Sequence, residues 1–205
     1  MSKKRMVGCV LFEGFEILDV MGPVEMFGMH PDSFEIIMVA ENRGEVASRQ
    51  GPKSIADHAF QDQHEYNILL VPGGPGTRDE ANNETLLNWL RTTGSKVEFL
   101  TSVCTGSALL AKAGLLDGKR ATSNKISFDW VKSHGPGANW ISQARWVEDG
   151  NVFTSSGVSA GMDMTLALIA NILGPQAAED AAYWAEYTWH SDADHDPFAK
   201  AAGLV

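Results

Sequence analysis

The sequence predicts an α/β fold in which a mostly parallel β-sheet is flanked by helices on both faces. Two observations support this prediction. Short apolar runs, typical of strands that are buried on both faces, alternate with segments that carry helix signals. Most of these runs end at turns rich in glycine, proline or other small residues. We expect a single domain over residues 1–205, with a core at about 5–189 and a C-terminal tail at 190–205.

The first half of the chain supplies three predicted strands and two predicted helices. The strands are expected at residues 6–12, 34–40 and 67–71. The first helix is expected at 23–29, because a proline at position 23 suits the first turn of a helix. The second helix begins after Asn82 or Asn83, either of which can cap it, and it carries three leucines on one face. The polar stretch at 41–64 contains only short strand-like pieces.

The second half of the chain continues the alternation and adds a hairpin. A strand at 97–103 leads through a tight turn into a helix that ends near Gly114. Residues 145–154 are expected to form a β-hairpin around a type I′ turn, in which both central residues have positive φ. The helix expected at 162–173 is apolar over a wide face and should therefore be buried. The last helix is expected at 176–189.

Two features near the C-terminus allow more than one interpretation. A group of aromatic residues can line a pocket or a subunit interface, although packing in the core is the simpler interpretation. The group consists of Tyr183, Trp184, Tyr187 and Trp189. The acidic and histidine residues that follow can be imagined as metal ligands, but they crowd one segment, so a solvated acidic tail is favoured and no metal is expected. These residues are His190, Asp192, Asp194, His195 and Asp196.

Composition limits the partners and the compartment of the protein. The formal net charge is −10 and the only basic run lies at 3–5, which argues against nucleic acid or an anionic membrane as a partner. No apolar stretch approaches the length that spans a membrane. The only two cysteines, Cys9 and Cys104, lie in apolar contexts, and we expect both to be thiols in a reducing cytoplasm.

Cys104 is the most informative residue, because it lies in a tight turn between a predicted strand and a predicted helix. Small residues surround it in the sequence TSVCTG at 101–106, and they allow the strained backbone that such a turn imposes. At the N-terminus of a helix, unpaired amides and the helix dipole should lower the pKa of the thiol. The alternative is a cysteine that packs as a small hydrophobic residue. The turn therefore offers a candidate nucleophile.

Two further loops are expected at the same edge of the sheet, where parallel α/β folds bind ligands. Asp19 has apolar neighbours, so burial should raise its pKa and keep a proton on it. The alternative is a helix N-terminal acid that accepts hydrogen bonds from local amides. Gly73 and Gly74 follow a buried strand, and the N–H groups of Gly74 and Thr105 could bind a developing negative charge. The alternative here is an ordinary glycine-rich turn.

These loops resemble those of the ThiJ/PfpI superfamily, whose members have a flavodoxin-like fold of the class I glutamine amidotransferase type with a nucleophile elbow. The resemblance covers residues 7–187, and the segments after the cysteine resemble the branch that includes the isocyanide (isonitrile) hydratases. The matching segments are LDVMGP at 18–23, VPGG at 71–74, TSVCTG at 101–106, AGLLDGKRAT at 113–122 and SAGMD at 159–163.

The resemblance implies a cysteine-dependent hydration of small organic isocyanides to N-substituted formamides. Cys104 would attack the terminal carbon to give a thioimidate-like adduct, and Asp19 would deliver a proton to that carbon and position water. Thr105 would assist through its amide and its hydroxyl, and Gly74 would complete a polar cradle. Because members of the superfamily are usually homodimers, we expect a homodimer that acts on a small molecule without a cofactor.

Two positions depart from the pattern of the superfamily. Many members carry a histidine after a strand, in a stretch similar to Ala-Thr-Thr-His, whereas this chain has Asn124 at that position. Asparagine cannot act as a base, which weakens a Cys-His interpretation such as a peptidase or an amidotransferase. Ser156 lies in a stretch that replaces a more glycine-rich one, so Asn124 and Ser156 are candidate pocket residues.

Three alternatives to isocyanide hydration are open at this point. A glyoxalase-like activity on dicarbonyls would also need Cys104. A ligand-sensing role is suggested by related domains that are fused to helix-turn-helix regulators, although this chain shows no basic DNA-binding extension. A redox sensor would use oxidation of Cys104 to a sulfenic or sulfinic acid as its signal.

Overall fold

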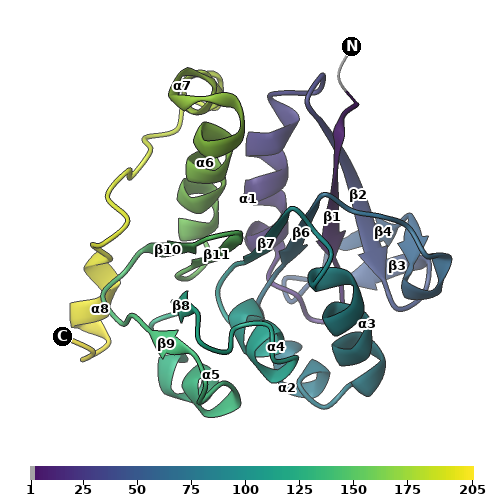
Figure 1. The fold of residues 1–205 in the computed structure, drawn as a ribbon, viewed down its shortest axis with the longest axis horizontal. Coiled ribbons are helices and arrows are strands. Elements are labelled where there is room, and N and C mark those ends of the chain that lie inside the picture. Colours follow the sequence, from purple (N-terminus) through teal and green to yellow (C-terminus); the bar gives the residue numbers. More distant parts are fainter. Residues whose placement is uncertain (1–2) are drawn as a thin grey trace.

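The computed structural model describes residues 3–205, and its central feature is a seven-stranded sheet with helices packed against it (Figure 1). The strand order is β10-β11-β7-β6-β1-β2-β5, and every neighbouring pair is parallel except β10 and β11. The strands are β1 (Arg5–Val10), β2 (Phe34–Ala40), β5 (His58–Ala59), β6 (Ile68–Val71), β7 (Phe99–Ser102), β10 (Trp146–Asp149) and β11 (Val152–Ser155). The predicted α/β fold with a mostly parallel sheet is confirmed.

The helices form two groups that cover the sheet (Figure 1). In one group α1 and α7 contact α6, and in the other α2, α3 and α5 contact α4. The helices are α1 (Ile17–Gly28), α2 (Thr77–Glu80), α3 (Glu84–Gly94), α4 (Gly106–Lys112), α5 (Phe128–His134), α6 (Ala160–Leu173), α7 (Pro175–Trp184) and α8 (Pro197–Ala201). Within residues 3–205, none of them is long and apolar enough to cross a membrane.

Shorter elements lie outside the main sheet. Most come from the polar stretch at 41–64, which folds into an antiparallel hairpin followed by a short strand of the main sheet and one 3-10 turn. A second pair of short strands is parallel and follows α4. These elements are β3 (Gly44–Ala47), β4 (Lys53–Ala56), η1 (Phe60–Asp62), β8 (Arg120–Ala121) and β9 (Asn139–Trp140).

The register of the central strands brings three loops to one edge of the sheet. Val71 at the end of β6 pairs with Ser102 at the end of β7, and Thr154 near the end of β11 pairs with the same serine. Every residue of β6 and of β11 is buried, so the loops that follow these strands leave from the core of the protein. The turn that carries Cys104 therefore leaves the sheet beside the loops that follow β6 and β11.

Helix α1 begins earlier than predicted. It starts at Ile17 and contains Pro23 in its interior, so the prediction that proline opens this helix is wrong. Proline lacks an N–H group, and the carbonyl of Asp19 four residues earlier loses its usual helical partner. The helix nevertheless continues because Val20, Met26 and other residues bury its inner face. As a result Asp19 lies in the first turn of a helix and not in a loop.

Two other local predictions are corrected by backbone conformation. The hairpin of β10 and β11 is confirmed, but only Gly150 of its two central residues has positive φ, at +66°. One such residue in the first central position fits a type II′ turn and not the type I′ turn that was predicted. Helix α7 ends at Trp184, before the predicted end at residue 189, because Glu186 adopts a left-handed conformation with φ +48°.

The C-terminal segment packs against the domain, which corrects the expectation of a freely solvated tail. The carbonyl of Ala193 accepts a hydrogen bond from Arg145 N at 2.7 Å, and Asp196 N donates to Gln143 at 2.8 Å. Asp196 is 2% exposed and caps α8 through its side chain. Within residues 3–205, no cluster of three or more histidine, cysteine, aspartate or glutamate side chains is arranged to hold a metal ion.

The aromatic residues at 183–189 do not all belong to the core. Tyr183 and Trp184 are 77% and 73% exposed, so the simpler interpretation of core packing is wrong for these two. Their side chains leave the last turn of α7, where the helix faces solvent. Tyr187 and Trp189 are half-buried, and both hydrogen-bond Asp163.

Candidate active site

Cys104 lies in the turn between β7 and α4 and is 6% exposed. Its φ of +58° lies in the left-handed region, which residues other than glycine rarely adopt. Its N–H donates to the carbonyl of Ser156 at 3.1 Å, and its carbonyl accepts from the hydroxyl of Ser123 at 2.8 Å. Only glycine fits at position 106, because a Cβ on Gly106 would lie 2.3 Å from the carbonyl oxygen of Val71. The predicted strand, tight turn and helix around the cysteine are confirmed.

Asp19 is fully buried beside Cys104. Its Oδ2 accepts a hydrogen bond from Gly73 N at 2.8 Å, whereas its Oδ1 has no hydrogen-bond partner among the described residues. Burial raises the pKa of Asp19 to about 7; the Gly73 amide and Cys104 act against the rise, and the Glu16 carboxylate adds to it. A carboxyl group with this pKa still holds a proton close to neutral pH.

The thiol of Cys104 does not have the lowered pKa that the sequence predicts. Burial raises its pKa above the ordinary value, and the charge on Asp19 raises it further. The backbone N–H groups of Thr105 and Val158 and the hydroxyl of Thr105 act in the opposite direction. Desolvation outweighs the dipole of a helix of only seven residues. Cys9, in β1, is also a free thiol and has no exposed surface.

The glycine loop does not present a free anion cradle, which corrects the expected role of its amides. Gly73 N–H donates to Asp19, and Gly74 N–H donates to Thr105 Oγ1 at 3.0 Å. The Thr105 amide is directed at the sulfur of Cys104. Close packing explains both glycines, because a Cβ would lie 2.5 Å from Thr105 N at position 73 and 2.5 Å from the backbone nitrogen of residue 16 at position 74. The amides of Gly73 and Gly74 therefore hold the side chains of Asp19 and Thr105 in place.

Asn124 and Ser156 both lie near the cysteine turn, but they make different contacts. Asn124 Oδ1 accepts from Ser127 N at 3.0 Å, and its Nδ2 lies against Gly157, where a Cβ would approach it to 2.5 Å. Ser156 is 3% exposed, and its backbone carbonyl accepts a hydrogen bond from the N–H of Cys104. Asn124 therefore lies against the loop that follows β11, whereas Ser156 holds the backbone of the cysteine turn.

Three residues of the site escape prediction from the sequence. Val158 has φ +50°, a strained conformation for a β-branched residue, and its N–H is directed at Cys104. Thr77 is fully buried, and its hydroxyl lies 3.1 Å from the hydroxyl of Thr105. Arg78 donates to Thr77 Oγ1 at 3.0 Å. The only local signal is their place in the chain, since Thr77 and Arg78 begin the short helix after β6 and Val158 follows β11.

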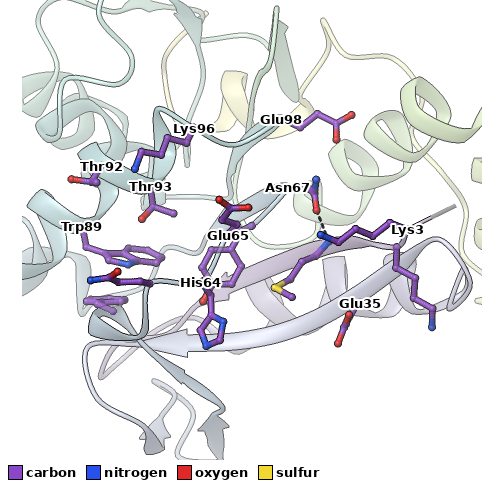
Figure 2. Close-up of a pocket in the computed structure, with 15 residues that line it drawn as sticks. Lys3, Glu35, His64, Glu65, Asn67, Trp89, Thr92, Thr93, Lys96 and Glu98 are labelled. Atoms are coloured by element: carbon purple, nitrogen blue, oxygen red, sulfur yellow. Dashed lines mark hydrogen bonds between the residues drawn. The ribbon is translucent and has the colours of Figure 1, made fainter.

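A cavity of about 890 Å³ lies at the opposite edge of the sheet (Figure 2). Met6, Glu35, Asn67 and Glu98 line it, and they mark the amino ends of β1, β2, β6 and β7. None of the candidate site residues lines it. Figure 2 shows Trp89 at one end of the cavity, with the charged side chains spread around the remaining wall.

The known proteins with similar sequences include an enzyme and a transcriptional regulator. The chain is 33% identical to isonitrile hydratase from Pseudomonas putida over 88% of its own length and 78% of that protein. It is 31% identical to the HTH-type transcriptional regulator CdhR from Pseudomonas aeruginosa over 82% of its length, but it spans only 51% of that regulator.

Solved structures and a family model agree with this picture. The crystal structure of a ThiJ/PfpI family protein from Pseudomonas syringae superposes with a TM-score of 0.84 at 31% identity, over 95% of this chain and 77% of that one. The DJ-1/PfpI family model matches residues 5–171, a span that holds Asp19, the glycine loop, the Cys104 turn and Val158. Because this match covers most of the chain and every segment that builds the site, the protein belongs to the DJ-1/PfpI family.

Proposed function

We propose that this protein hydrates small organic isocyanides to N-substituted formamides, with Cys104 as the nucleophile and Asp19 as the acid and base. The observation that carries the proposal is a buried carboxyl group of raised pKa beside the elbow cysteine. Asn124 stands where a histidine base would be expected, which leaves Asp19 as the proton carrier. The 33% identity to an isonitrile hydratase supports the same reaction.

In the first half of the reaction a C–S bond forms. The terminal carbon of an isocyanide accepts an electron pair from the sulfur of Cys104, and the thiol proton passes through Asp19 to that same carbon. The product is a thioimidate, in which carbon is bonded to sulfur, hydrogen and the substituted nitrogen. The Thr105 hydroxyl and the amides of Thr105 and Val158 stabilise negative charge on the sulfur before it attacks.

In the second half of the reaction water adds to the thioimidate carbon. Asp19 gives its proton to the substituted nitrogen and accepts one from the water as the C–O bond forms, and the C–S bond then breaks as the new hydroxyl loses its proton and becomes the carbonyl of the formamide. The sulfur regains a proton, so the cysteine and the carboxyl group return to their starting states. One isocyanide and one water molecule are consumed for each formamide, and no electron is gained or lost.

A comparison of three proteins tests the proposal: the unmodified chain, Cys104→Ala and Asp19→Asn, each mixed with an aryl isocyanide. We expect formamide from the unmodified protein, none from Cys104→Ala, and a loss of at least about a hundredfold in kcat/KM for Asp19→Asn, as is typical when a general acid is removed. Formamide formation by the Cys104→Ala variant would exclude the mechanism.

A parallel incubation with methylglyoxal separates the competing functions. Lactate formation without formamide would favour the glyoxalase-like activity on dicarbonyls. Turnover of neither compound would favour a sensing role, to which the similarity to a transcriptional regulator lends support. Either result would contradict the proposed hydration.

A further inference from the structure

The backbone carbonyl of Cys104 accepts hydrogen bonds from two hydroxyl groups. Ser123 Oγ donates to it at 2.8 Å, and Ser107 Oγ donates to it at 3.1 Å. Both serines are fully buried. A carbonyl oxygen can only accept, so the direction of both hydrogen bonds is fixed, and together they occupy its two lone pairs. No backbone N–H of residues 3–205 donates to this carbonyl, so the two hydroxyls are what hold it.

The two hydroxyls hold a residue whose backbone is strained. The φ of Cys104 is +58°, a conformation that persists only where the surrounding structure enforces it. The N–H of Cys104 donates to the carbonyl of Ser156 at 3.1 Å, so the peptide groups on both sides of the residue are restrained. Ser107 lies only three residues further along the chain, in α4, whereas Ser123 lies nineteen residues away. Of the two hydroxyls, Ser123 is therefore the one that ties the turn to a distant segment.

The segment that carries Ser123 is itself anchored in the core. Thr122 N donates to the hydroxyl of Thr154 in β11 at 2.8 Å. The Thr122 hydroxyl in turn accepts from Lys125 Nζ at 2.8 Å, and Lys125 is 4% exposed. Because its neighbours on both sides are buried and hydrogen-bonded, the Ser123 hydroxyl has little freedom to leave the carbonyl of Cys104.

The orientation of the Cys104 carbonyl also sets the direction of the Thr105 N–H, because both belong to one planar trans peptide group. In such a group the C=O and the N–H point in opposite directions. The serines hold the carbonyl on one side of the turn, and the N–H is directed to the other side. No oxygen atom of residues 3–205 accepts a hydrogen bond from Thr105 N. An unpaired N–H on the residue after the nucleophile can stabilise negative charge that develops beside the sulfur.

We propose that Ser123 is a positioning residue that holds the Cys104–Thr105 peptide group and thereby directs the Thr105 N–H into the site. The Ser123 hydroxyl acts through the carbonyl of Cys104 and does not touch the substrate. The inference deepens the proposed function and, as regards turnover, rests on it. The peptide group can nevertheless be observed without any isocyanide, which keeps the two proposals separable.

The test compares the unmodified protein with Ser123→Ala and with Thr165→Val. Thr165 is the matched control, because its hydroxyl is also buried and donates to a backbone carbonyl, that of Gly161, at 2.8 Å within α6. Each substitution removes one buried hydroxyl, so both should lower the urea midpoint of unfolding. Relaxation dispersion of the Thr105 amide nitrogen reports motion of the peptide group on the microsecond to millisecond timescale. Steady-state kinetics with an aryl isocyanide report turnover.

We expect exchange broadening of the Thr105 amide in Ser123→Ala only, because the strained turn then has one restraint fewer. The same variant should lose about fivefold in kcat, which corresponds to about 1 kcal/mol for one hydrogen bond, while KM stays unchanged. Thr165→Val should change neither the amide nor kcat, although it also loses stability. If Ser123→Ala does not fold, Ser107→Ala removes the other donor from the same carbonyl and replaces it in both measurements.

Two results would overturn the inference. One is a Thr105 amide in Ser123→Ala that behaves as in the unmodified protein. The other is an unchanged kcat in Ser123→Ala despite exchange broadening, since the Thr105 N–H would then need no positioning. Exchange broadening in Ser123→Ala, when the unmodified protein forms no formamide, would refute the proposed function and leave intact the restraint that Ser123 places on the peptide group.

Discussion

Asp19 and Cys104 are two weak acids buried against each other, with 0% and 6% of their surfaces exposed. Burial raises the pKa of both groups, and a charge on Asp19 raises the pKa of the thiol further. The pair therefore favours at most one negative charge, and its titration belongs to both groups together. Near neutral pH this places a proton on a carboxyl group at the point where the proposed reaction protonates carbon.

The raised pKa of Asp19 makes the stability of the protein depend on pH. Below about pH 4 the folded and unfolded states both hold the proton, and the full contribution of the neutral carboxyl group to stability is present. As the pH rises from about 4 to about 7, the unfolded chain releases the proton while the folded protein keeps it, so this contribution is lost. The difference between an ordinary pKa of 3.8 and about 7 corresponds to about 4 kcal/mol.

Asp19→Asn removes this titration and keeps an acceptor for Gly73 N–H. Relative to the unmodified protein, the variant should gain free energy of unfolding between about pH 4 and pH 7, and the difference should be constant above about pH 8. Urea denaturation at four pH values measures it. Parallel stability profiles for the two proteins would mean that the pKa of Asp19 does not change on folding.

The sequence predicts residue properties well where they depend on nearby residues. The burial of Asp19 follows from its apolar neighbours, and the strained turn at Cys104 follows from the small residues around it. The prediction of a lowered thiol pKa is wrong, because the burial of Cys104 depends on packing between distant segments that no local sequence pattern shows. Thr77 and Val158 escape prediction for the same reason, since they reach the turn from segments that are distant from it in the sequence.

At the scale of elements, the first turn of α1 is held by a loop from the β3–β4 hairpin. Glu16 precedes the helix but does not cap it with its own side chain. Instead Gln50 Oε1 accepts from Ile17 N at 3.2 Å, and Gln50 Nε2 donates to a carboxylate oxygen of Glu16. A residue more than thirty positions away therefore caps the helix that carries Asp19.

Gln50→Ala should lower the free energy of unfolding by about 1 kcal/mol, the usual cost of removing a helix cap. It should also slow formamide production, because the first turn of α1 sets where Asp19 lies. Denaturant unfolding and steady-state kinetics measure the two effects. Gln61→Ala is the matched control, because Gln61 is exposed and makes no side-chain hydrogen bond among the described residues. Equal values for both variants would contradict the capping role.

Elements with strong periodicity or a cap signal could be predicted closely. The strand at 34–40 matches β2, and Asn83 caps α3 as expected, because its side chain accepts from Thr85 N and Leu86 N in the first turn of the helix. Helix α2 has only four residues and no apolar face to show in the sequence. Pro23 misled the prediction of α1, because burial of the helix overrides a local rule about proline.

At the scale of the whole molecule, a buried ion pair ties the C-terminal segment to the site. Arg145 and Asp163 are 4% and 0% exposed, and their charged atoms approach to 2.6 Å. Asp163 Oδ1 accepts from Tyr187 and from His190 N, which docks the segment after α7. The carbonyl of Arg145 accepts a hydrogen bond from Ser156 N at 2.8 Å, and the carbonyl of Ser156 accepts one from the N–H of Cys104.

Asp163→Asn should lower the free energy of unfolding by about 3–5 kcal/mol, because it leaves the buried guanidinium of Arg145 without its counter-charge. It should also speed proteolysis of the segment that follows α7. Glu98→Gln is the control, since Glu98 pairs with Arg5 at the surface, where loss of a pair costs less than about 1 kcal/mol. Urea unfolding and limited proteolysis measure both effects, and similar losses in the two variants would count against the anchoring role.

The docking of this segment could not be predicted, because its composition of histidine and aspartate is typical of solvated chain. Asp163 lies in the predicted apolar helix, and nothing in its local sequence indicates a buried arginine eighteen residues earlier. The overall fold could be predicted because alternating buried strands and helices allow few arrangements.

The complete burial of Cys9 within β1 gives the protein a built-in measure of its folded population. Burial also raises the pKa of this thiol to about 12, so it stays unreactive while the sheet is intact. A native molecule accordingly hides this sulfur from a maleimide, whereas a denatured molecule exposes it. The stoichiometry of labelling, read by intact mass, reports the fraction of native chains in any mixture without an optical signal.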